Sequence, residues 1–496
     1  MSAASLASGP ATNSTRISLL RRIFSFPTLI ACLLAVLAVL TVRDRFDDPD
    51  LWLHLKTGQL IWTTHTIPTT DLFSWTTQHH PTLPHEWLAQ TLIYAAYRLG
   101  GYFGLMLWLC LASSAILIAG YGLCWLCSGN AKVSFVGALA VWFFATIGLS
   151  IRPQMIGYLL LIAELALLHL GRTRNPRWFF ALPPLFALWV NCHGSFSLGL
   201  LLAFILLITA YIDIDNYLLL STPWEPRRRR ALALALEGSL LALLLNPVGL
   251  RLILYPFHAL GGMTLAASAV SEWQPLQLSD IRALALLAVL ASIVLLVIVR
   301  RSQLFLHELL FLAAATWLAA SHRRLLFVFG ILAAPILCRL LANTWETWDP
   351  EHDRPTPNAV LITIALLVCW LAFPSPANLA AQVAAGSPVA AVDFIHAHHL
   401  SGPMLNDWPD GGYLVWAAPD HLVFIDGRGD PFDQTGITQQ FGDWATLRTD
   451  PRILLDKYGI AFCLLDRGSP MTFVLPLMPG WQLVYSDSQS VIFTHN

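Results

Sequence analysis

Long apolar segments recur along the whole chain, and they limit its possible folds more than any other feature of the sequence. Each is about 17–25 residues long, the length of an α-helix that crosses a bilayer. Only 12% of the 496 residues are charged, about half the fraction usual in a soluble protein. The sequence therefore predicts a mostly α-helical, polytopic membrane protein. We interpret about eleven segments as spans, near 26–42, 101–127, 133–150, 155–170, 178–190, 196–212, 231–246, 282–299, 303–320, 325–342 and 359–375.

The basic residues between these spans indicate how the chain is oriented. If the N-terminus is cytoplasmic, most basic clusters fall inside, which is the positive-inside pattern: Arg21, Arg22, Arg172, Arg174, Arg177, Arg227 to Arg230, Arg300, Arg301 and Arg339. Arg323 and Arg324 break the pattern because they fall on the outer face. The prediction is a membrane domain at 1–375 with an acidic outer loop at 43–87, and an extracytoplasmic domain at 376–496.

The outer loop at 43–87 is chemically unusual for a connection between two spans. It holds five aspartates, one glutamate and five histidines. The pattern from 49 to 61 predicts a short helix, in which Asp50 and His54 share one face. Leu51, Leu55 and Trp62 are expected to rest on lipid headgroups. The segment 86–99 is either a surface helix or an extension of the second span.

The other unusual polar residues also end spans on the predicted outer face. Ionisable groups at membrane depth are costly and usually mark a pathway or a site. Each group alone is equally well explained as a helix cap or an interfacial anchor. Their shared side favours one extracytoplasmic cavity, lined by His54, Asp71, His85, Glu86, Arg152, Gln154, His193, Glu272, His322, Arg323 and Arg324.

Carboxylates and arginines at a membrane surface suit a substrate with a lipid phosphate and a hydroxyl group. An aspartate, here Asp48 or Asp50, can deprotonate or orient the hydroxyl. Arginines can hold the leaving phosphate in paired hydrogen bonds. A divalent cation, Mg²⁺ or Mn²⁺, is a further ligand that Asp48 and Asp50 can hold. This chemistry predicts glycosyl transfer from a polyprenyl-phosphate sugar to an envelope acceptor that the sequence does not identify.

Several motifs resemble the GT-C class of membrane glycosyltransferases, in particular bacterial proteins related to the protein mannosyltransferases and aminoarabinose transferases. The motifs are Asp48-Pro-Asp-Leu-Trp-Leu-His-Leu, Pro68-Thr-Thr-Asp-Leu-Phe-Ser, His85-Glu-Trp-Leu, Arg152-Pro-Gln, Asn191-Cys-His-Gly and Glu272-Trp-Gln-Pro. The resemblance covers most of the chain and implies a location in the bacterial cytoplasmic membrane. It implies a catalytic aspartate in the first outer loop, at Asp48 or Asp50. Asp47-Asp48 stands where the protein mannosyltransferases have Asp-Glu, which leaves the acceptor open.

The segment 376–496 has a different composition, with twelve aspartates, no glutamate and five lysines or arginines. Helix-like stretches at 388–400 and 451–458 alternate with strand-like stretches at 412–416, 422–426, 461–465, 481–485 and 491–494, which predicts a small α/β domain. Turn chemistry explains its polar residues as well as a ligand site at strand ends does; these residues are Asp407, Asp410, Asp426, Arg428 and Asp430.

Two other functions compete with a transferase. A secondary transporter would also place charges in the membrane, but it usually has internal repeats and broken helices, and the sequence shows no repeat. A non-catalytic assembly protein for envelope polysaccharide explains the acidic C-terminal segment but not the outer His, Arg and Asp clusters. The net charge of −1 argues against a nucleic-acid partner.

Overall fold

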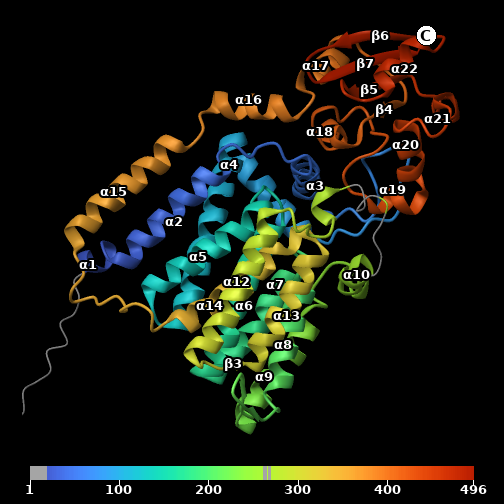
Figure 1. The fold of residues 1–496 in the computed structure, drawn as a ribbon. Helices are drawn as coiled ribbons and strands as arrows, with labels where there is room; N and C mark the ends of the chain where they lie inside the picture. The colour runs from blue at the N-terminus through green and yellow to red at the C-terminus, as the bar shows by residue number, and fades with distance from the viewer. Residues whose placement is uncertain (1–18, 261–264, 266–269, 496) are drawn as a thin grey trace, which may run out of the picture.

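The computed structural model describes residues 19–260, 265 and 270–495. A bundle of helices carries a smaller part of helices and strands at one end, built from C-terminal residues (Figure 1). A helix lies in every segment that the sequence predicts as a span. The bundle helices are α1 (Leu19–Ile23), α2 (Phe26–Val42), α4 (Trp87–Ser128), α5 (Ala131–Ala145), α6 (Gln154–Thr173), α7 (Leu182–Trp189), α8 (Phe196–Thr209), α9 (Pro226–Ala242), α10 (Leu250–Leu260), α12 (Ile281–Arg300), α13 (Leu306–Ser321), α14 (Leu326–Leu341) and α15 (Pro355–Ala372).

Six helical segments of the described chain are long and apolar enough to cross a membrane, by length and composition. They are α4, α6, α12, α15, α5 with the 3-10 turn η1 (Thr146–Gly148), and α14 with the 3-10 turn η4 (Arg323–Leu325). The shorter helices α2, α8 and α13 are also apolar. The prediction of a helical, multi-pass membrane protein is thus confirmed, whereas the count of eleven spans stays a prediction.

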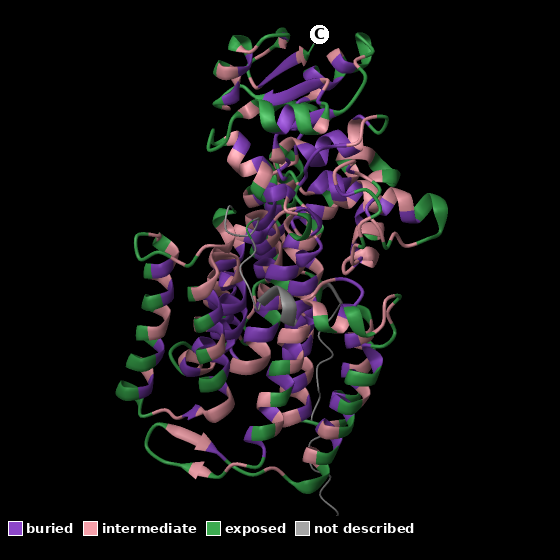
Figure 2. Ribbon diagram, turned by 90° about the vertical axis from the view of Figure 1, so that its right-hand side faces the viewer, coloured by how far each residue is buried: buried purple, intermediate pink, exposed green. Residues whose placement is uncertain are grey.

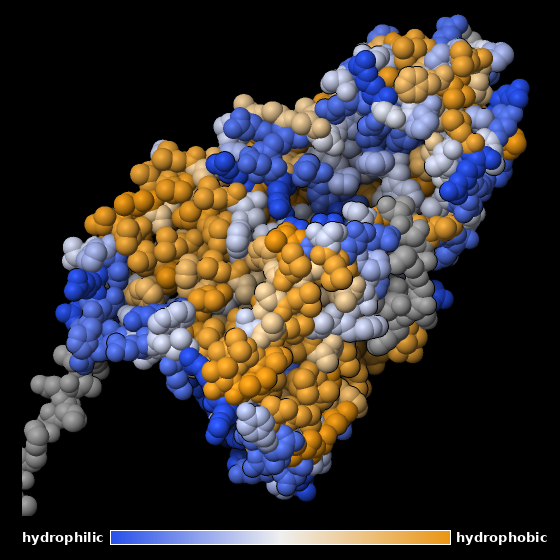
Figure 3. Space-filling view, viewed as in Figure 1, coloured by the Kyte–Doolittle hydropathy of each residue, from blue (hydrophilic) through white to orange (hydrophobic). Residues whose placement is uncertain are grey.

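The burial of these helices separates the centre of the bundle from its lipid-facing surface. In α14, 78% of the apolar window is buried, against 22% in α12 and 17% in α15. Val299 of α12 and Trp370 of α15 are more than two-thirds exposed, at 69% and 74%. Figure 2 shows buried residues along the central helices and exposed ones on the outer helices, and Figure 3 shows the outer surface as mostly hydrophobic. Such side chains are stable where hydrocarbon, rather than water, surrounds them.

Helix α4 distinguishes between the two structures expected for residues 86–99, a surface helix or an extension of the second span. It begins at Trp87 and continues to Ser128, but Gly100 and Gly101 inside it are not helical. Gly101 has φ +57°, in the left-handed region where glycine is favoured. The segment is therefore an extension of the second span that a two-glycine kink sets at an angle to it.

The helix predicted in the first outer loop is α3 (Leu51–Thr64), which packs against α4 and α18 (Gly411–Ala417). The expectation that Leu51 and Leu55 rest on lipid headgroups is wrong, since both are 0% exposed. The C-terminal part of the chain covers α3 from one side and the bundle covers it from the other (Figure 1). Helix α3 is therefore largely covered by protein as far as Ile61, whereas Trp62 is 38% exposed and its expected contact with headgroups stays a prediction.

The C-terminal part contains a four-stranded sheet in the order β4-β5-β7-β6. Strands β4 (Met404–Asn406) and β5 (Phe462–Asp466) are parallel, while β7 (Ser490–His495) is antiparallel to both β5 and β6 (Trp481–Ser486). The surrounding helices are α16 (Pro376–Gly386), α17 (Val389–Ala397), α18, α19 (Asp430–Thr435), α20 (Ile437–Ala445), α21 (Pro451–Tyr458) and α22 (Met471–Val474). The predicted domain boundary at 375/376 falls between α15 and α16 and stays a prediction.

Two strand predictions in this part are wrong. Residues 412–416 form α18, and residues 422–426 make only an isolated bridge, from Val423 to Ser74 of the first outer loop. Short apolar runs do not distinguish a buried helix from a buried strand. In α18, a side chain at Gly412 would meet the Pro49 carbonyl oxygen, so this glycine allows α18 to approach the start of α3 closely.

At the far end of the bundle, a small sheet joins two connections between helices. It consists of β1 (Ile214–Asp215), β2 (Leu219–Ser221) and β3 (Leu304–Phe305), in that order. Strand β3 lies next to the starts of α9 and α13 in this region (Figure 1).

Candidate functional site

A single guanidinium group binds three carboxylates between the bundle and the C-terminal part. Arg152 makes two hydrogen bonds to Asp48, from Nε to Oδ2 at 2.5 Å and from Nη2 to Oδ1 at 2.9 Å. Its Nη2 also lies 3.1 Å from Oδ2 of Asp50, and its Nη1 lies 2.9 Å from Oε1 of Glu272. We call these four residues, together with Arg324, the ion cluster. All were predicted as site residues, and the structure brings them together.

Local structure explains why Asp48 and Arg152 can meet. The Asp48 carboxylate accepts a hydrogen bond from the Asp50 amide, and the Asp48 carbonyl accepts one from Leu51, so this turn starts α3. Acidic groups are favourable at the positive end of a helix. Arg152 lies directly before Pro153, in the turn that starts α6. The contact between Asp48 and Arg152 therefore joins the starts of two helices.

Arg324 is the second arginine of the ion cluster. Its Nη2 donates to Oε1 of Gln154 at 3.1 Å, and its Nη1 lies 3.6 Å from Oε1 of Glu272. The guanidinium also stacks on Trp273, with 4.3 Å from Cζ to the ring centroid. Glu272 and Trp273 belong to the 3-10 turn η3 (Ser271–Trp273). Arg324 is thus held flat beside a carboxylate and remains 21% exposed.

The neighbouring predicted residues point elsewhere. Arg323 pairs with Asp280, at 3.0 Å from Nε to Oδ2, and makes no contact with the ion cluster. His322 lies edge-on to Trp273, with 5.6 Å between the ring centroids. Of the two arginines that break the orientation pattern, the structure therefore brings only Arg324 to the carboxylates of the ion cluster.

Two aspartates of the ion cluster differ in their protonation. Burial alone would raise the pKa of Asp48, but the charge and hydrogen bonds of Arg152 outweigh burial and lower that pKa. Burial, with the charges of Asp48 and Glu272, raises the pKa of Asp50 to about 6 despite Arg152. The Asp48 side chain is 7% exposed and that of Asp50 is 33% exposed. Asp50 is therefore the accessible carboxylate that exchanges a proton near neutral pH.

A second polar group lies beside the ion cluster, around Glu86 at the start of α4. Oε1 of Glu86 is 3.8 Å from Nε2 of His85 and 3.7 Å from Nε2 of His193. His54 approaches from α3, where its Nδ1 is 3.2 Å from Nε2 of Gln90. Burial lowers the pKa of His193 to about 4 and also lowers that of His54, so both imidazoles are neutral at pH 7. These predicted residues form one patch of three imidazoles around a carboxylate.

Asp71 lies apart from both groups. Its carboxylate is 0% exposed, binds Nη1 of Arg428 at 2.5 Å, and accepts further hydrogen bonds from Thr77 and the Phe73 amide. Arg428 also binds both oxygens of Asp426. Asp71 therefore joins the first outer loop to the C-terminal part, and its predicted contact with substrate would need this buried arrangement to open.

Sequence reasoning missed two further residues at the site. A Cβ atom on Gly427 would lie 2.5 Å from Oδ1 of Asp50, so a side chain at this position would displace that carboxylate. Tyr255 stacks on His85, with 4.5 Å between ring centroids, and donates to Asp430 at 3.1 Å. The polar sequence from Gly427 to Asp430 was consistent with a ligand site, but a turn explained it equally well.

Comparison with known proteins identifies the fold. No protein-family model matches the sequence, and no curated protein matches it. Several solved structures match over nearly the whole chain. The oligosaccharyltransferase of Archaeoglobus fulgidus, solved with a tethered acceptor peptide containing the NVT sequon, matches 96% of this chain and 75% of its own, with 12% identity and a TM-score of 0.56. ArnT from Cupriavidus metallidurans, solved with undecaprenyl phosphate, matches 94% of this chain and 97% of its own, with 14% identity and a TM-score of 0.53.

Both solved proteins are GT-C glycosyltransferases. This chain has the GT-C fold. The resemblance inferred from the sequence motifs is confirmed at the level of the fold. In this fold, the ion cluster lies where the first outer loop meets the C-terminal part.

The GT-C fold raises the question of a metal, because the A. fulgidus enzyme has also been solved with Zn and sulfate, matching 94% of this chain and 73% of its own, with 11% identity and a TM-score of 0.51. Here, both oxygens of Asp48 and Oδ2 of Asp50 lie against Arg152, and the Mg²⁺ or Mn²⁺ expected between the two aspartates stays a prediction. Within residues 19–260, 265 and 270–495, no three His, Cys, Asp or Glu side chains are placed to hold a metal. A guanidinium supplies the positive charge at this site.

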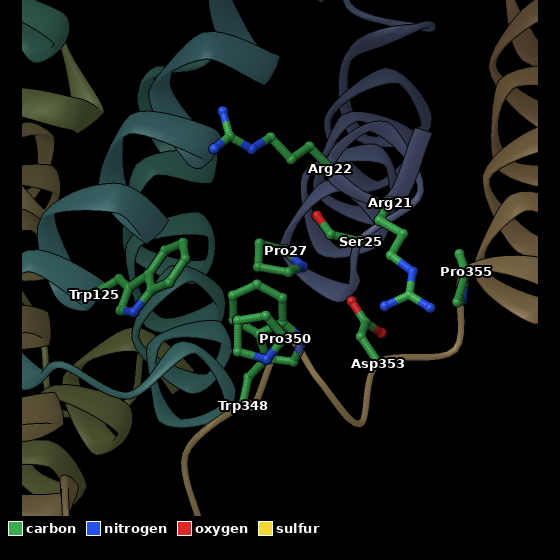
Figure 4. A pocket seen from close by; sticks show the side chains of 9 residues that line it. All are labelled: Arg21, Arg22, Ser25, Pro27, Trp125, Trp348, Pro350, Asp353 and Pro355. Carbon is green, nitrogen blue, oxygen red and sulfur yellow. The ribbon is translucent and has the colours of Figure 1, made fainter. Parts of the chain in front are cut away.

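A cavity of about 150 Å³ lies at the other end of α2 from the ion cluster. Figure 4 shows Trp125 and Trp348 on one side of it and Arg21, which points toward Asp353, on the other. The Asp353 carboxylate accepts hydrogen bonds from the Phe26 amide and from Asn358. This arrangement ties α1, α2 and α15 together, and it is remote from the ion cluster of the GT-C fold.

Proposed function

We propose that this chain is a membrane glycosyltransferase that moves a sugar from a polyprenyl-phosphate donor to an acceptor on the extracytoplasmic face. The observation that carries the proposal is the ion cluster itself. It places one accessible carboxylate, Asp50, beside two guanidinium groups, those of Arg152 and Arg324, on a GT-C fold.

In this proposal Asp50 is the general base. With a pKa of about 6, it is mostly ionised at pH 7 and can accept the proton of the acceptor's hydroxyl. The acceptor oxygen then bonds to the anomeric carbon of the sugar, and the bond from that carbon to the phosphate oxygen breaks. The electron pair of the broken bond stays on the phosphate. Asp48, held by Arg152 with a lowered pKa, orients that arginine and accepts no proton.

Arg324 is the phosphate ligand in this proposal, with Arg152 behind it. It stacks on Trp273 and is 21% exposed, so its planar donors are held in place and reachable. A lipid phosphate has the geometry for paired bonds with such a group. Two structural neighbours support this donor class. ArnT was solved with undecaprenyl phosphate, and the oligosaccharyltransferase AglB from A. fulgidus was solved with dolichol phosphate and an inhibitory peptide. AglB matches 97% of this chain and 75% of its own, with 12% identity and a TM-score of 0.54.

The patch around Glu86 is the proposed acceptor-binding surface. His54 and His193 are neutral hydrogen-bonding groups beside Asp50, His85 adds a third imidazole, and Tyr255 adds an aromatic face. Neutral donors and acceptors with an aromatic ring suit a hydroxyl-rich acceptor. The proposed location is the bacterial cytoplasmic membrane, with the N-terminus inside and the C-terminal part outside.

The experiment compares Asp50→Asn with Asp47→Asn in membranes supplied with a radiolabelled polyprenyl-phosphate sugar. Asp47 is an exposed neighbour outside the ion cluster. Loss of a general base should lower the rate of sugar transfer by roughly 100-fold or more, with normal accumulation of the protein. Asp47→Asn should transfer at the rate of the wild type. Equal rates for both variants would favour the alternative, a non-catalytic assembly protein or transporter.

A binding measurement isolates the phosphate ligand. Undecaprenyl phosphate retained by the purified protein can be counted by native mass spectrometry for wild type, Arg324→Lys and Arg323→Lys. Lysine keeps the charge but loses the planar fork, so Arg324→Lys should retain roughly tenfold less lipid. Arg323→Lys is the matched control, because Arg323 pairs with Asp280 instead. Unchanged retention in Arg324→Lys would remove this residue from the phosphate site.

A further inference from the structure

A second group of arginines lies at the far end of the bundle from the ion cluster. Arg172 is at the end of α6, Arg228 is in the first turn of α9, and Arg339 is near the end of α14. Arg172 and Arg339 lie against Phe305 in β3, and Arg228 lies on α9, which contacts α6, close enough to repel Arg172. We call them the distal arginine cluster. The proposed function uses none of these residues.

Two of these arginines share one aromatic ring. Cζ of Arg172 is 4.6 Å from the centroid of Phe305, and Cζ of Arg339 is 4.8 Å from it. Arg339 is neutralised by Glu308, which it binds at 2.7 Å from Nε to Oε1 and at 2.5 Å from Nη2 to Oε2. Its place in the cluster is therefore explained by a buried ion pair.

Arg172 and Arg228 have no such partner. Within the described part of the chain, neither has a carboxylate within 4.0 Å. The Nε atom of Arg228 is buried and has no hydrogen-bond acceptor there. Arg172 is repelled by both Arg339 and Arg228, and it is attracted by Glu308, which already binds Arg339. Three guanidinium groups against one carboxylate leave an excess of positive charge in a half-buried place.

Buried donors and excess charge are costly unless an anion satisfies them. We propose that the distal arginine cluster binds the phosphate group of an anionic membrane lipid at the cytoplasmic end of the bundle. Arg172 and Arg228 bind the phosphate. The ion pair of Arg339 with Glu308 holds the Phe305 ring on which Arg172 rests. The proposal does not depend on the transferase activity.

The surroundings of the cluster favour a lipid over a soluble phosphate. Leu309 and Leu310 on α13, one turn from Phe305, are 38% and 36% exposed, which places apolar surface next to the charges. Arg229 lies over the ring of Tyr211, which is 58% exposed, at 4.5 Å from Cζ to the centroid. Basic groups beside aromatic and aliphatic side chains are typical of the membrane–water boundary. Figure 3 shows hydrophilic residues at this end, next to the hydrophobic surface of the bundle.

The test uses the full-length protein in phosphatidylcholine nanodiscs that contain a minor fraction of phosphatidylglycerol. Native mass spectrometry counts the phosphatidylglycerol retained by wild type and by a double variant, Arg172→Gln with Arg228→Gln. The matched control is Arg174→Gln with Arg177→Gln, which removes two exposed arginines from the same end of the bundle. Inorganic phosphate is added in a separate arm as a competitor.

We expect about fivefold weaker retention for each arginine removed, so roughly 25-fold for the double variant, and no change in the control. If the double variant does not accumulate, Arg228→Gln alone should show the fivefold loss. This single substitution removes no ion pair, so the protein should still fold. Equal retention in wild type and variant overturns the proposal. Full displacement by inorganic phosphate at the same concentration overturns the lipid assignment and indicates a soluble phosphate.

Discussion

Nη1 of Arg428 lies 2.5 Å from Oδ1 of Asp71, although 357 residues separate them in the sequence. This contact fastens the first outer loop to the C-terminal part, where the Ser74–Val423 bridge and the Trp75 side chain, bound to the Met404 carbonyl, add to it. The loop that carries Asp50 is therefore held from outside the membrane bundle.

Replacing Arg428 by methionine should strongly destabilise the protein. Asp71 and Asp426 would lose their shared cation while both side chains are 0% exposed, and breaking a buried pair in this way costs about 3–5 kcal/mol. The midpoint of thermal unfolding measures the effect. Arg452→Met is the control, since its pair with Asp450 is on the surface and should contribute nothing measurable. Equal midpoints for both variants would contradict a structural role for the Arg428 contacts.

The rate of sugar transfer should rise with pH through about 6. The pKa of Asp50 is raised to about 6 by burial and by the charges of Asp48 and Glu272, so below that pH the proposed base is protonated and cannot accept a proton. Above it the carboxylate is ionised and the rate should reach a plateau. Rates measured between pH 5 and 8 check this. A profile that falls across this interval would exclude Asp50 as the base.

Gly427→Ala should lower the transfer rate without preventing folding. The added methyl group would lie 2.5 Å from Oδ1 of Asp50, and the flexible carboxylate is the group that moves. A displaced general base should lose roughly tenfold or more in rate. Gly442→Ala is the matched control, because a side chain there meets nothing within 4 Å. The comparison fails to support the site if both variants keep the wild-type rate at equal expression.

Asp48 and the C-terminal part should lie on the same side of the membrane. Thr69 in the first outer loop and Ser401 between α17 and β4 are both exposed, so cysteines at these positions can be labelled. A membrane-impermeant thiol reagent should modify both in intact cells. A position that reacts only after the membrane is opened would place the two segments on opposite sides and would falsify the orientation.

The sequence alone determined the class of the protein and most of its site. Hydropathy is a property of each segment by itself, so the helical membrane fold, and a helix in every predicted span, followed from the residues. The prediction that the polar clusters share one face also named the residues that the structure gathers, which are Asp48, Asp50, Arg152, Glu272 and Arg324. The helix in the first outer loop was predicted to within a few residues of α3.

Only the tertiary structure decided which of these groups pair. Arg323 and Arg324 are equivalent in the sequence, yet one binds Asp280 and the other approaches Glu272. The difference in pKa between Asp48 and Asp50 arises from burial and from the position of the Arg152 guanidinium. Neither can be inferred from the residues next to the two aspartates. The covering of α3 and the helical state of residues 412–416 depend on packing between segments far apart in the chain. Apolar character is encoded residue by residue, whereas pairing and protonation depend on which distant groups exclude water together.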